Sequence, residues 1–324
     1  HILMSSNNSQ RPVCRILDNG LAVVDISPFF SGVPEKKQEV VNAIENAFTN
    51  IGCLYITGHG IDNSVVEGMM EQSAKFFNKP LNEKMKVVNT KSFGPGYCPI
   101  ESENINFAFG KPGLPNDPLE KFSVGPYAIP PEGLDNHLFY ARNIPPKSHE
   151  YDVATRDYYY AVKNLMFTLL RISAQALKVD PKDLIDSHKD GGLLLKAYKY
   201  PKVKPKENQL RMPEHFDYTS ITILAMTDVK ESLEVKKKNN EWVFADYVPD
   251  AFFINIGLVM GRWTNDKWRP TPHRVRWAPN EAERLSIAFF ASPRPDYVMD
   301  CIVETNEVKK YEPMSIENVI GELL

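Results

Sequence analysis

Two histidines and one aspartate are the residues of this chain whose types and spacing best suit a metal site. His215 and Asp217 stand two positions apart in a stretch with strand-like patterns, and side chains two apart on a strand project from the same face. His273 begins a second strand candidate further along the chain. Two imidazoles and one carboxylate on one face of a metal leave its other positions open, as non-haem iron(II) chemistry requires. The spacing therefore predicts an open iron site.

An arginine and a serine on the next strand candidate could bind a carboxylate beside that metal. After a turn-like segment at residues 278–281 the chain returns through Arg284 and Ser286. If the two strands form a hairpin folded about its centre, His273 faces Arg284, with their Cβ atoms about 5 Å apart. A guanidinium with a hydroxyl beside it can hold one end of a short dicarboxylate while the other end reaches the metal.

Other interpretations of these residues remain open. Each half of the pattern is weak alone, because histidine and aspartate are common on any protein surface. A structural arginine that closes a turn is the alternative for Arg284. A structural zinc site is disfavoured, since such sites are usually closed by four ligands, often cysteines. The cysteines lack C-x-x-C spacing and are predicted to be reduced and mostly buried; they are Cys14, Cys53, Cys98 and Cys301.

The composition is that of an ordinary globular protein. Of the 324 residues, 43% are hydrophobic and 24% are charged, and the net charge is −3. This balance lacks the large basic face of a nucleic-acid binder, so we expect a small-molecule substrate and no nucleic acid. No apolar stretch could span a bilayer and the first residues are polar, which predicts a cytoplasmic protein without membrane contact. We expect a monomer. Residues 1–3 precede a candidate initiator, Met4, and are left out of the fold prediction.

The apolar periodicity predicts helices in the first half and short strands in the second. Helical spacing covers residues 40–48, 63–77 and about 152–177, where Asp180-Pro181 ends the pattern. Strand-like runs lie at residues 21–26, 53–56, 193–200, 220–227, 233–235, 242–245, 251–256 and 285–291. Several runs have no polar face, as expected of a sheet that is covered on both sides. The order predicts a β-sandwich or open barrel with an α-helical jacket.

Several short motifs occur in the order in which one enzyme family carries them. In the first half they are Val24-Asp25-Ile26-Ser27, Gly58-His59-Gly60, Gly96-Tyr97 and residues 120–125. In the second half they are Tyr198-Lys199-Tyr200-Pro201, the two histidines with Asp217, Asn255-Ile256-Gly257, Arg284-x-Ser286 and Tyr311-Glu312-Pro313-Met314. Over nearly its whole length the chain resembles the Fe(II)/2-oxoglutarate-dependent dioxygenases of the isopenicillin N synthase-like group.

The resemblance implies a mainly β fold with α-helices. Its core would be a double-stranded β-helix, or jelly roll, with an N-terminal helical jacket and a C-terminal helix. We expect an N-terminal α/β region at residues 1–180, the jelly-roll core at 181–300 and a C-terminal helical lid at 301–324, all within one structural unit.

The resemblance also assigns roles to particular residues. His215, Asp217 and His273 would bind Fe(II), and Arg284, Ser286 and Tyr200 would bind the co-substrate 2-oxoglutarate. Dioxygen is the further co-substrate, with ascorbate as a supporting reductant. Side chains that flank these motifs are candidate substrate contacts, and they are Phe93, Tyr97, Tyr198, Arg211 and Phe216.

The activity so implied is oxidation of a C–H bond in a small molecule of specialised metabolism, with release of succinate and CO2. Hydroxylation, desaturation and oxidative ring closure are all compatible with one such iron centre. Two alternatives stay open at this point. One is an oxidase of the same fold that uses no 2-oxoglutarate and turns Arg284 and Ser286 to its own substrate. The other is a catalytically silent binding protein.

Overall fold

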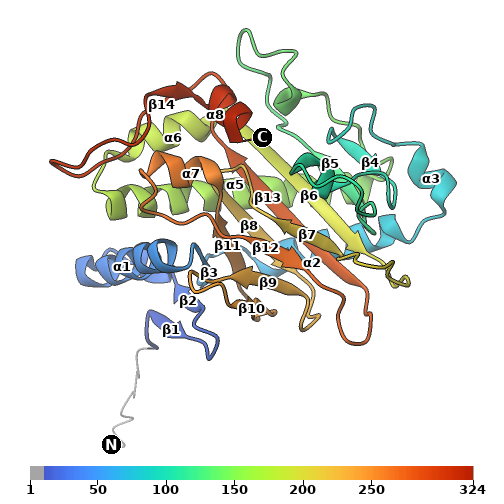
Figure 1. Cartoon of the computed structure of the whole chain (residues 1–324), viewed down its shortest axis with the longest axis horizontal. Helices are drawn as coiled ribbons and strands as arrows, with labels where there is room; N and C mark the ends of the chain where they lie inside the picture. The colour runs from blue at the N-terminus through green and yellow to red at the C-terminus, as the bar shows by residue number, and fades with distance from the viewer. Residues whose placement is uncertain (1–10, 324) are drawn as a thin grey trace, which may run out of the picture.

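A large, twisted sheet is the central layer of the fold (Figure 1). The computed structural model describes residues 11–323, so the candidate initiator Met4 lies outside the described residues. Nine strands follow the order β1-β2-β3-β11-β8-β13-β6-β5-β4. Their bounds are β1 Cys14–Ile16, β2 Ala22–Asp25, β3 Cys53–Thr57, β4 Gly96–Cys98, β5 Glu120–Val124, β6 Gly192–Tyr200, β8 Ile221–Met226, β11 Phe252–Ile256 and β13 Arg284–Ser292. Strands from both halves of the chain therefore share one sheet.

A smaller sheet lies in front of the large one in the view of Figure 1. Its order is β10 (Trp242–Phe244), β9 (Leu233–Lys236), β12 (His273–Val275) and β7 (Met212–His215). One cluster of apolar side chains joins the two sheets; it includes Val235 and Val275 from the small sheet and Tyr55, Phe253 and Tyr200 from the large one. Two sheets packed face to face form the predicted jelly-roll core.

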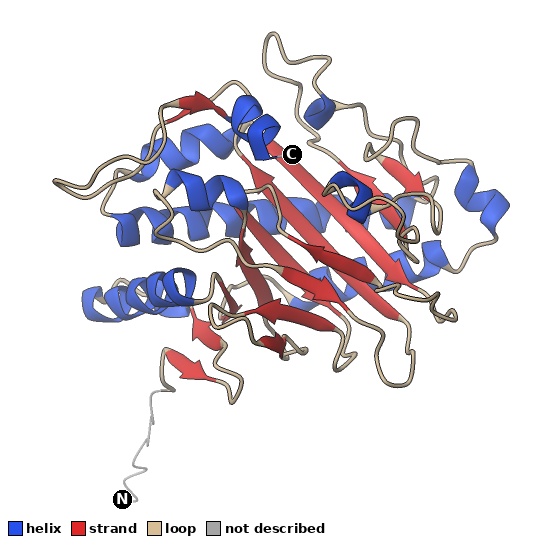
Figure 2. Cartoon of the chain, in the orientation of Figure 1, coloured by secondary structure: helices blue, strands red, loops and turns tan. Residues whose placement is uncertain are grey.

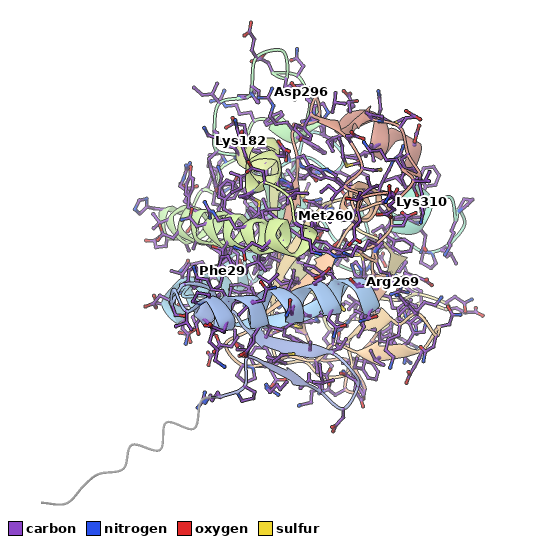
Figure 3. All side chains as sticks on the ribbon, turned by 90° about the vertical axis from the view of Figure 1, so that its left-hand side faces the viewer. Phe29, Lys182, Met260, Arg269, Asp296 and Lys310 are labelled. Carbon is purple, nitrogen blue, oxygen red and sulfur yellow. The ribbon has the colours of Figure 1, made fainter. Side chains whose placement is uncertain are left out.

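Helices cover the opposite face of the large sheet (Figure 2). The principal helices are α1 (Pro34–Asn50), α2 (Asn63–Phe77), α5 (His149–Leu177) and α6 (Pro181–Lys189). Figure 3 shows α5 above α1 on this side, with Met260 of α7 labelled close by. A second apolar cluster, which includes Met166 and Leu169 of α5 and Ile223 and Phe289 of the sheet, fills the space between the helices and strands. The helical jacket is thus attached through a separate core.

Shorter helices complete the chain. They are α3 (Leu81–Met85), α4 (Ile105–Ala108), α7 (Leu258–Trp263) and α8 (Ile316–Leu323), with 3-10 turns η1 (Ser27–Phe29) and η2 (Leu138–Tyr140). The sequence prediction missed α6, because it interpreted Asp180-Pro181 only as a helix stop. In the structure the Asp180 carboxylate caps α6 and accepts a hydrogen bond from the backbone N–H of Lys182 at 2.9 Å. Proline suits the first position of a helix, where no intrahelical N–H bond is needed.

The predicted hairpin between His273 and Arg284 is wrong. His273 pairs with His215 and Val235 in the small sheet, whereas Arg284 pairs with Tyr200 in the large one. The segment between β12 and β13 crosses from one sheet to the other, as connections in a jelly roll do. The two strands are neighbours in sequence but not in a ladder.

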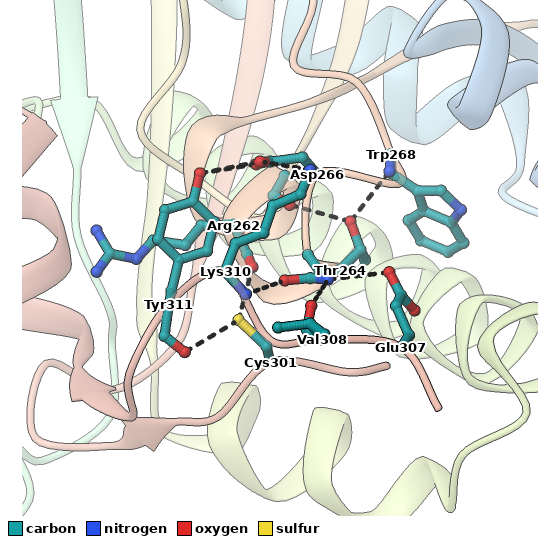
Figure 4. Close-up of polar contacts among 11 residues, drawn as sticks. Arg262, Thr264, Asp266, Trp268, Cys301, Glu307, Val308, Lys310 and Tyr311 are labelled. Carbon is teal, nitrogen blue, oxygen red and sulfur yellow. Dashed lines mark hydrogen bonds and ion pairs between the residues drawn. The ribbon is translucent and has the colours of Figure 1, made fainter. Parts of the chain in front are cut away.

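The C-terminal segment is attached to the loop that follows α7 (Figure 4). The side chain of Asn265 donates to Glu307 at 2.9 Å and accepts from the backbone N–H of Lys310 at 2.8 Å. The Tyr311 hydroxyl donates to the carboxylate of Asp266 at 3.0 Å. The following helix α8 buries Ile316 and Val319 against the helical side of the fold, together with the small sheet of β14 (Val298–Met299) and β15 (Met314–Ser315). Its role as a lid stays a prediction.

Two further sequence predictions concern the cysteines and membranes. All four cysteines are free thiols, and three of them are buried, as predicted. Within residues 11–323, no helix combines the length and the apolar character needed to cross a membrane.

A buried ion pair lies between the large sheet and the helices. The Lys84 ammonium contacts the Glu120 carboxylate at 2.7 Å and donates to the carbonyl oxygen of Phe77 at 2.9 Å. The Tyr97 hydroxyl donates to the same carboxylate at 2.5 Å. Both charged side chains are under 10% exposed, so each depends on the other for compensation of its charge.

We expect Lys84→Met to lower the free energy of unfolding by about 3–5 kcal/mol, because it leaves Glu120 buried without a cation. Lys86→Met is the matched control, since the Lys86 partner Glu83 is exposed to solvent. The control should leave the urea midpoint unchanged. Equal urea midpoints for the two variants would show that the buried pair does not stabilise the fold.

Candidate metal centre

The two predicted histidine ligands meet where two strands of the small sheet pair. His215 ends β7, His273 begins β12, and the two residues are directly opposed in the ladder. Their ring centroids are 4.2 Å apart. Asp217 lies beyond the end of β7, so strand alternation, as predicted from the sequence, is not what orients it.

Asp217 is oriented instead by hydrogen bonds from the large sheet. Its Oδ2 atom accepts from the Thr222 hydroxyl of β8 at 2.6 Å and from the Asn255 amide of β11 at 2.7 Å. Its backbone carbonyl accepts from the N–H of Leu258 at 2.8 Å. The other carboxylate oxygen, Oδ1, lies 3.7 Å from His215 Nε2 and 3.5 Å from His273 Nε2. One oxygen is therefore held by the protein and the other faces both imidazoles.

Each imidazole is fixed by a hydrogen bond to a backbone carbonyl. His215 Nδ1 lies 2.7 Å from the carbonyl oxygen of Pro213, and His273 Nδ1 lies 2.9 Å from that of Thr271. A carbonyl can only accept, so the Nδ1 atoms carry the protons and the Nε2 atoms are free to bind a metal. Such outer contacts are typical of metal-binding histidines.

The charges of the three groups also suit a cation. Burial would raise the pKa of Asp217, but the two imidazoles and the Thr222 hydroxyl hold that pKa well below its usual range. Burial and His273 lower the pKa of His215 to about 4. Against the effect of burial, the Asp217 carboxylate raises the pKa of His273. An ionised carboxylate and a neutral His215 are the forms that bind metal.

These donors fit a divalent iron. Within the described residues, His215, Asp217 and His273 are the group whose ligand atoms all lie within 4.8 Å of one another. Two nitrogen donors and one oxygen donor form one face of a coordination sphere and leave the remaining positions for other ligands. The structure thus brings together the three residues that the sequence singled out.

The predicted carboxylate clamp lies at one end of strands β6 and β13. Arg284 is 2% exposed and pairs with Tyr200, whose ring centroid is 5.2 Å from the guanidinium carbon. Ser286 lies two residues along β13 on the same face. Among residues 11–323 no carboxylate pairs with Arg284, and its Nε atom has no hydrogen-bond partner. A buried guanidinium without a counter-charge fits an anionic ligand such as a carboxylate.

The candidate substrate contacts differ in their positions. Tyr198 lies on the clamp side of β6, opposite Ser286. Phe93 is exposed, and its ring lies 5.2 Å from the ammonium of Lys121, the neighbour of Tyr198 on β5. Phe216 lies between two metal-site residues and is partly exposed.

Tyr97 and Arg211 are the two buried candidates; the prediction for Tyr97 is wrong, whereas that for Arg211 stays a prediction, since its Nε and Nη1 atoms have no hydrogen-bond partner among residues 11–323. Successive residues of a strand point to opposite faces of its sheet. Tyr97 points to the helical face and is buried in the core there. Arg211 is fully buried and donates through Nη2 to the carbonyl oxygens of Ala282 at 2.6 Å and Glu281 at 3.2 Å. Burial and the nearby Arg284 lower the pKa of Arg211. Arg211 therefore anchors the β12–β13 connection and adds positive charge near the clamp.

Some residues around the centre were not identified from the sequence. Thr222, which holds Asp217, gave no signal in its spacing. Asn255 belongs to the motif Asn255-Ile256-Gly257, but the resemblance assigned it no role. Phe109, after α4, lies 6.3 Å from the His215 ring and stacks on Tyr218 at 5.5 Å. Contacts between residues that are far apart in the sequence leave no local pattern, so only the structure could show them.

Comparisons with known proteins agree with this geometry. Residues 21–146 match the family model described as non-haem dioxygenase in morphine synthesis N-terminal, and residues 191–293 match that of the 2OG-Fe(II) oxygenase superfamily. The 2-oxoglutarate-dependent dioxygenase tropC of Talaromyces stipitatus is 30% identical over 285 residues, which are 84% of this chain and 86% of that protein. The 2-oxoglutarate-Fe(II) type oxidoreductase hxnY of Emericella nidulans is 27% identical and covers 92% of this chain and 87% of its own length.

Solved structures share the fold. A full-length protein of Neurospora crassa, crystallised in complex with alpha-KG, superposes with a TM-score of 0.83 at 24% identity, over 97% of this chain and 99% of that one. The same protein with alpha-KG and thymine gives a TM-score of 0.81 at 25% identity, over 95% and 98%. This likeness confirms the jelly-roll fold class. The chain therefore belongs to the 2-oxoglutarate/Fe(II) oxygenase superfamily and is an Fe(II)/2-oxoglutarate-dependent dioxygenase that oxidises a small molecule.

Proposed function

We propose that His215, Asp217 and His273 hold the iron, and that Arg284, Ser286 and Tyr200 bind the far carboxylate of 2-oxoglutarate. The observation that carries the proposal is the buried Arg284 guanidinium. Its charge has no carboxylate partner among the described residues, and it lies on the sheet that also orients Asp217. A short dicarboxylate would supply the missing counter-charge.

When bound together with 2-oxoglutarate, the iron would activate dioxygen for the oxidation of a C–H bond. The contribution of the chain is orientation and exclusion of water. The carbonyls of Pro213 and Thr271 fix the two imidazoles, while Thr222 and Asn255 fix the carboxylate. Hydrogen bonds of this kind hold the side chains of a site near the geometry that binding requires.

The remaining predictions form part of the same proposal. Tyr198, Phe93, Phe216 and Arg211 are kept as substrate contacts, since each lies beside the metal residues, near Arg284 or on the clamp side of the sheet. We infer a monomer that acts in the cytoplasm and binds no nucleic acid, and the near-neutral net charge of −3 supports the last point. The division at residues 180 and 300 marks regions of one unit, because β1 to β5 of the first region join the large sheet.

The first test concerns the metal ligands. We expect His215→Ala to abolish 2-oxoglutarate-dependent succinate release and to weaken Fe(II) binding strongly, while circular dichroism shows an intact fold. His149→Ala, at an exposed position that begins α5, is the matched control and should behave as the wild type. Wild-type succinate release by His215→Ala would exclude it as a ligand.

A second test concerns the residue that orients Asp217. Thr222→Val removes one hydroxyl donor at nearly constant volume, so we expect Fe(II) affinity to fall by about 10-fold to 100-fold. The measurement is an anaerobic titration with the metal. Thr168→Val, at a half-buried position of α5 away from the metal centre, controls for the substitution itself. An unchanged metal affinity would mean that the Thr222 contact does not support the ligand.

A third test ranks the two polar residues of the clamp. Arg284→Met should weaken 2-oxoglutarate binding by about 2–5 kcal/mol, because it leaves the carboxylate of the ligand without its cation. Ser286→Ala should cost about 1 kcal/mol, the usual effect of losing one neutral hydrogen bond. Calorimetric titration of the Zn(II)-loaded proteins measures both, with Arg171→Met on α5 as the control. The reverse order of effects would contradict the assignment of Arg284.

A further inference from the structure

Strand β6 carries a lysine on the same face as the clamp residues. Along this strand Leu193, Leu195 and Ala197 are buried in the helical core, whereas Lys196 and Tyr198 are partly accessible. Side chains alternate along a strand, so Lys196 shares the face of Tyr198 and Tyr200. The ammonium therefore lies on the metal side of the large sheet.

The residues that pair directly with Lys196 have small side chains. Lys196 pairs with Ala288 of β13 on one side and with Ser123 of β5 on the other. Both neighbours are small, and directly paired residues share one face of the sheet. The ring of Phe290, further along β13 on this face, lies 5.5 Å from the ammonium nitrogen. A bound molecule could thus contact a cation, a hydroxyl and an aromatic ring together.

The strand pairing shows how far Lys196 lies from the metal centre. Ala288 also pairs with Leu224 of β8, and Thr222, two residues from Leu224, holds Asp217. Adjacent strands lie about 4.8 Å apart, so Lys196 is roughly 10 Å across the sheet from β8. Along β6 the lysine is four residues, or about 13 Å, from Tyr200 of the clamp.

Lys196 has no ion-pair partner among residues 11–323. The neighbouring ammonium of Lys121 forms an ion pair with Glu103, whose other oxygen accepts from the backbone N–H of Phe93 at 3.0 Å. Lys196 forms no ion pair with any residue between 11 and 323. The hydroxyl of Ser123, which is 4% exposed, has no hydrogen-bond partner in this part of the chain. A cation and a buried hydroxyl are therefore left for a ligand.

The titration of Lys196 agrees with this geometry. Burial and the Lys121 ammonium lower the pKa of Lys196 to about 7, against the opposing effects of Glu103, Cys98 and Asp217. An anion bound beside Lys196 would raise this pKa again, because it favours the charged form. Binding of an anion above neutral pH should then be accompanied by uptake of a proton.

We propose that Lys196, assisted by the Ser123 hydroxyl, binds an anionic oxygen group of the substrate to be oxidised, so that this enzyme acts on small organic acids. The proposal rests on the proposed function of the metal centre and clamp. It assigns the two ends of the site to two different carboxylates, with 2-oxoglutarate at Arg284 and the substrate at Lys196. The C–H bond to be oxidised would lie between the acid group and the iron.

The test uses the Zn(II)-loaded protein saturated with 2-oxoglutarate, so that Arg284 is occupied. The probes are aromatic, heteroaromatic and aliphatic monocarboxylates, each matched with its primary amide. Ligand-observed NMR measures binding, and calorimetry in two buffers of different ionisation enthalpy measures proton uptake. The variants are Lys196→Met, the conservative Lys196→Arg, and Lys199→Met as the matched control. Lys199 lies on the opposite face of β6 and pairs with Glu283 at 2.7 Å.

The wild type should bind at least one acid of the panel about 10-fold or more tightly than its amide, the scale of one charge-assisted contact. We expect Lys196→Met to lose that preference and the proton uptake, while its affinity for 2-oxoglutarate stays unchanged. Lys196→Arg should keep part of the preference, and Lys199→Met should keep all of it. A merely structural role of Lys196 would not change proton uptake or the ratio between acid and amide.

Three outcomes would overturn the proposal. The first is equal binding of acids and amides by the wild type, which would make Lys196 a neutral hydrogen-bond donor. The second is unaltered acid binding by Lys196→Met, and the third is failure of every acid to bind. If the wild type does not bind 2-oxoglutarate, the roles proposed for Arg284 and for the three metal ligands fail instead. Acid binding measured without 2-oxoglutarate then still decides the role of Lys196.

Discussion

The Asp217 carboxylate connects the two sheets on which the rest of the site depends. Asp217 lies two residues beyond the end of β7 in the small sheet, yet its Oδ2 atom is held by Thr222 and Asn255 of the large sheet. Its Oδ1 atom faces the two histidines that end β7 and begin β12. A displacement of one sheet relative to the other would separate these contacts. The packing of the jelly roll thus fixes the geometry of the metal ligands.

Two cations on the metal side of the large sheet, Arg284 and Lys196, form no ion pair with a carboxylate of residues 11–323. Glu103 forms its ion pair with Lys121, and Asp217 faces the two histidines, so neither carboxylate forms an ion pair with Arg284 or Lys196. Unpaired buried charges cost free energy in the absence of ligands. An enzyme whose co-substrate is a dianion can recover this cost on binding. The charge distribution therefore favours acids inside the barrel, although the net charge of the whole chain is slightly negative.

Much of the fold could be predicted from the sequence, because several strands are apolar runs that end at polar turns. The runs at 193–200 and 285–291 coincide with β6 and β13 within one residue. Pairing between strands was harder to predict. The hairpin between β12 and β13 was wrong because a two-layered fold allows consecutive strands to lie in different sheets. The residue types alone still singled out His215, Asp217 and His273, which the structure brings together, because these types restricted the possibilities more than strand pairing did.

The direction of individual side chains depends on register, which local patterns do not determine. Tyr97 and Cys98 are adjacent on β4, and a shift of one residue exchanges the faces that they occupy. The sequence therefore placed Tyr97 near the substrate when it lies in the helical core. For the same reason it did not single out Lys196, because its apolar neighbours hide the alternation of β6. Once the ladder is known, Lys196, Tyr198 and Tyr200 form one line toward the clamp. The strand that supplies a residue for the co-substrate is then also the strand that can select the substrate.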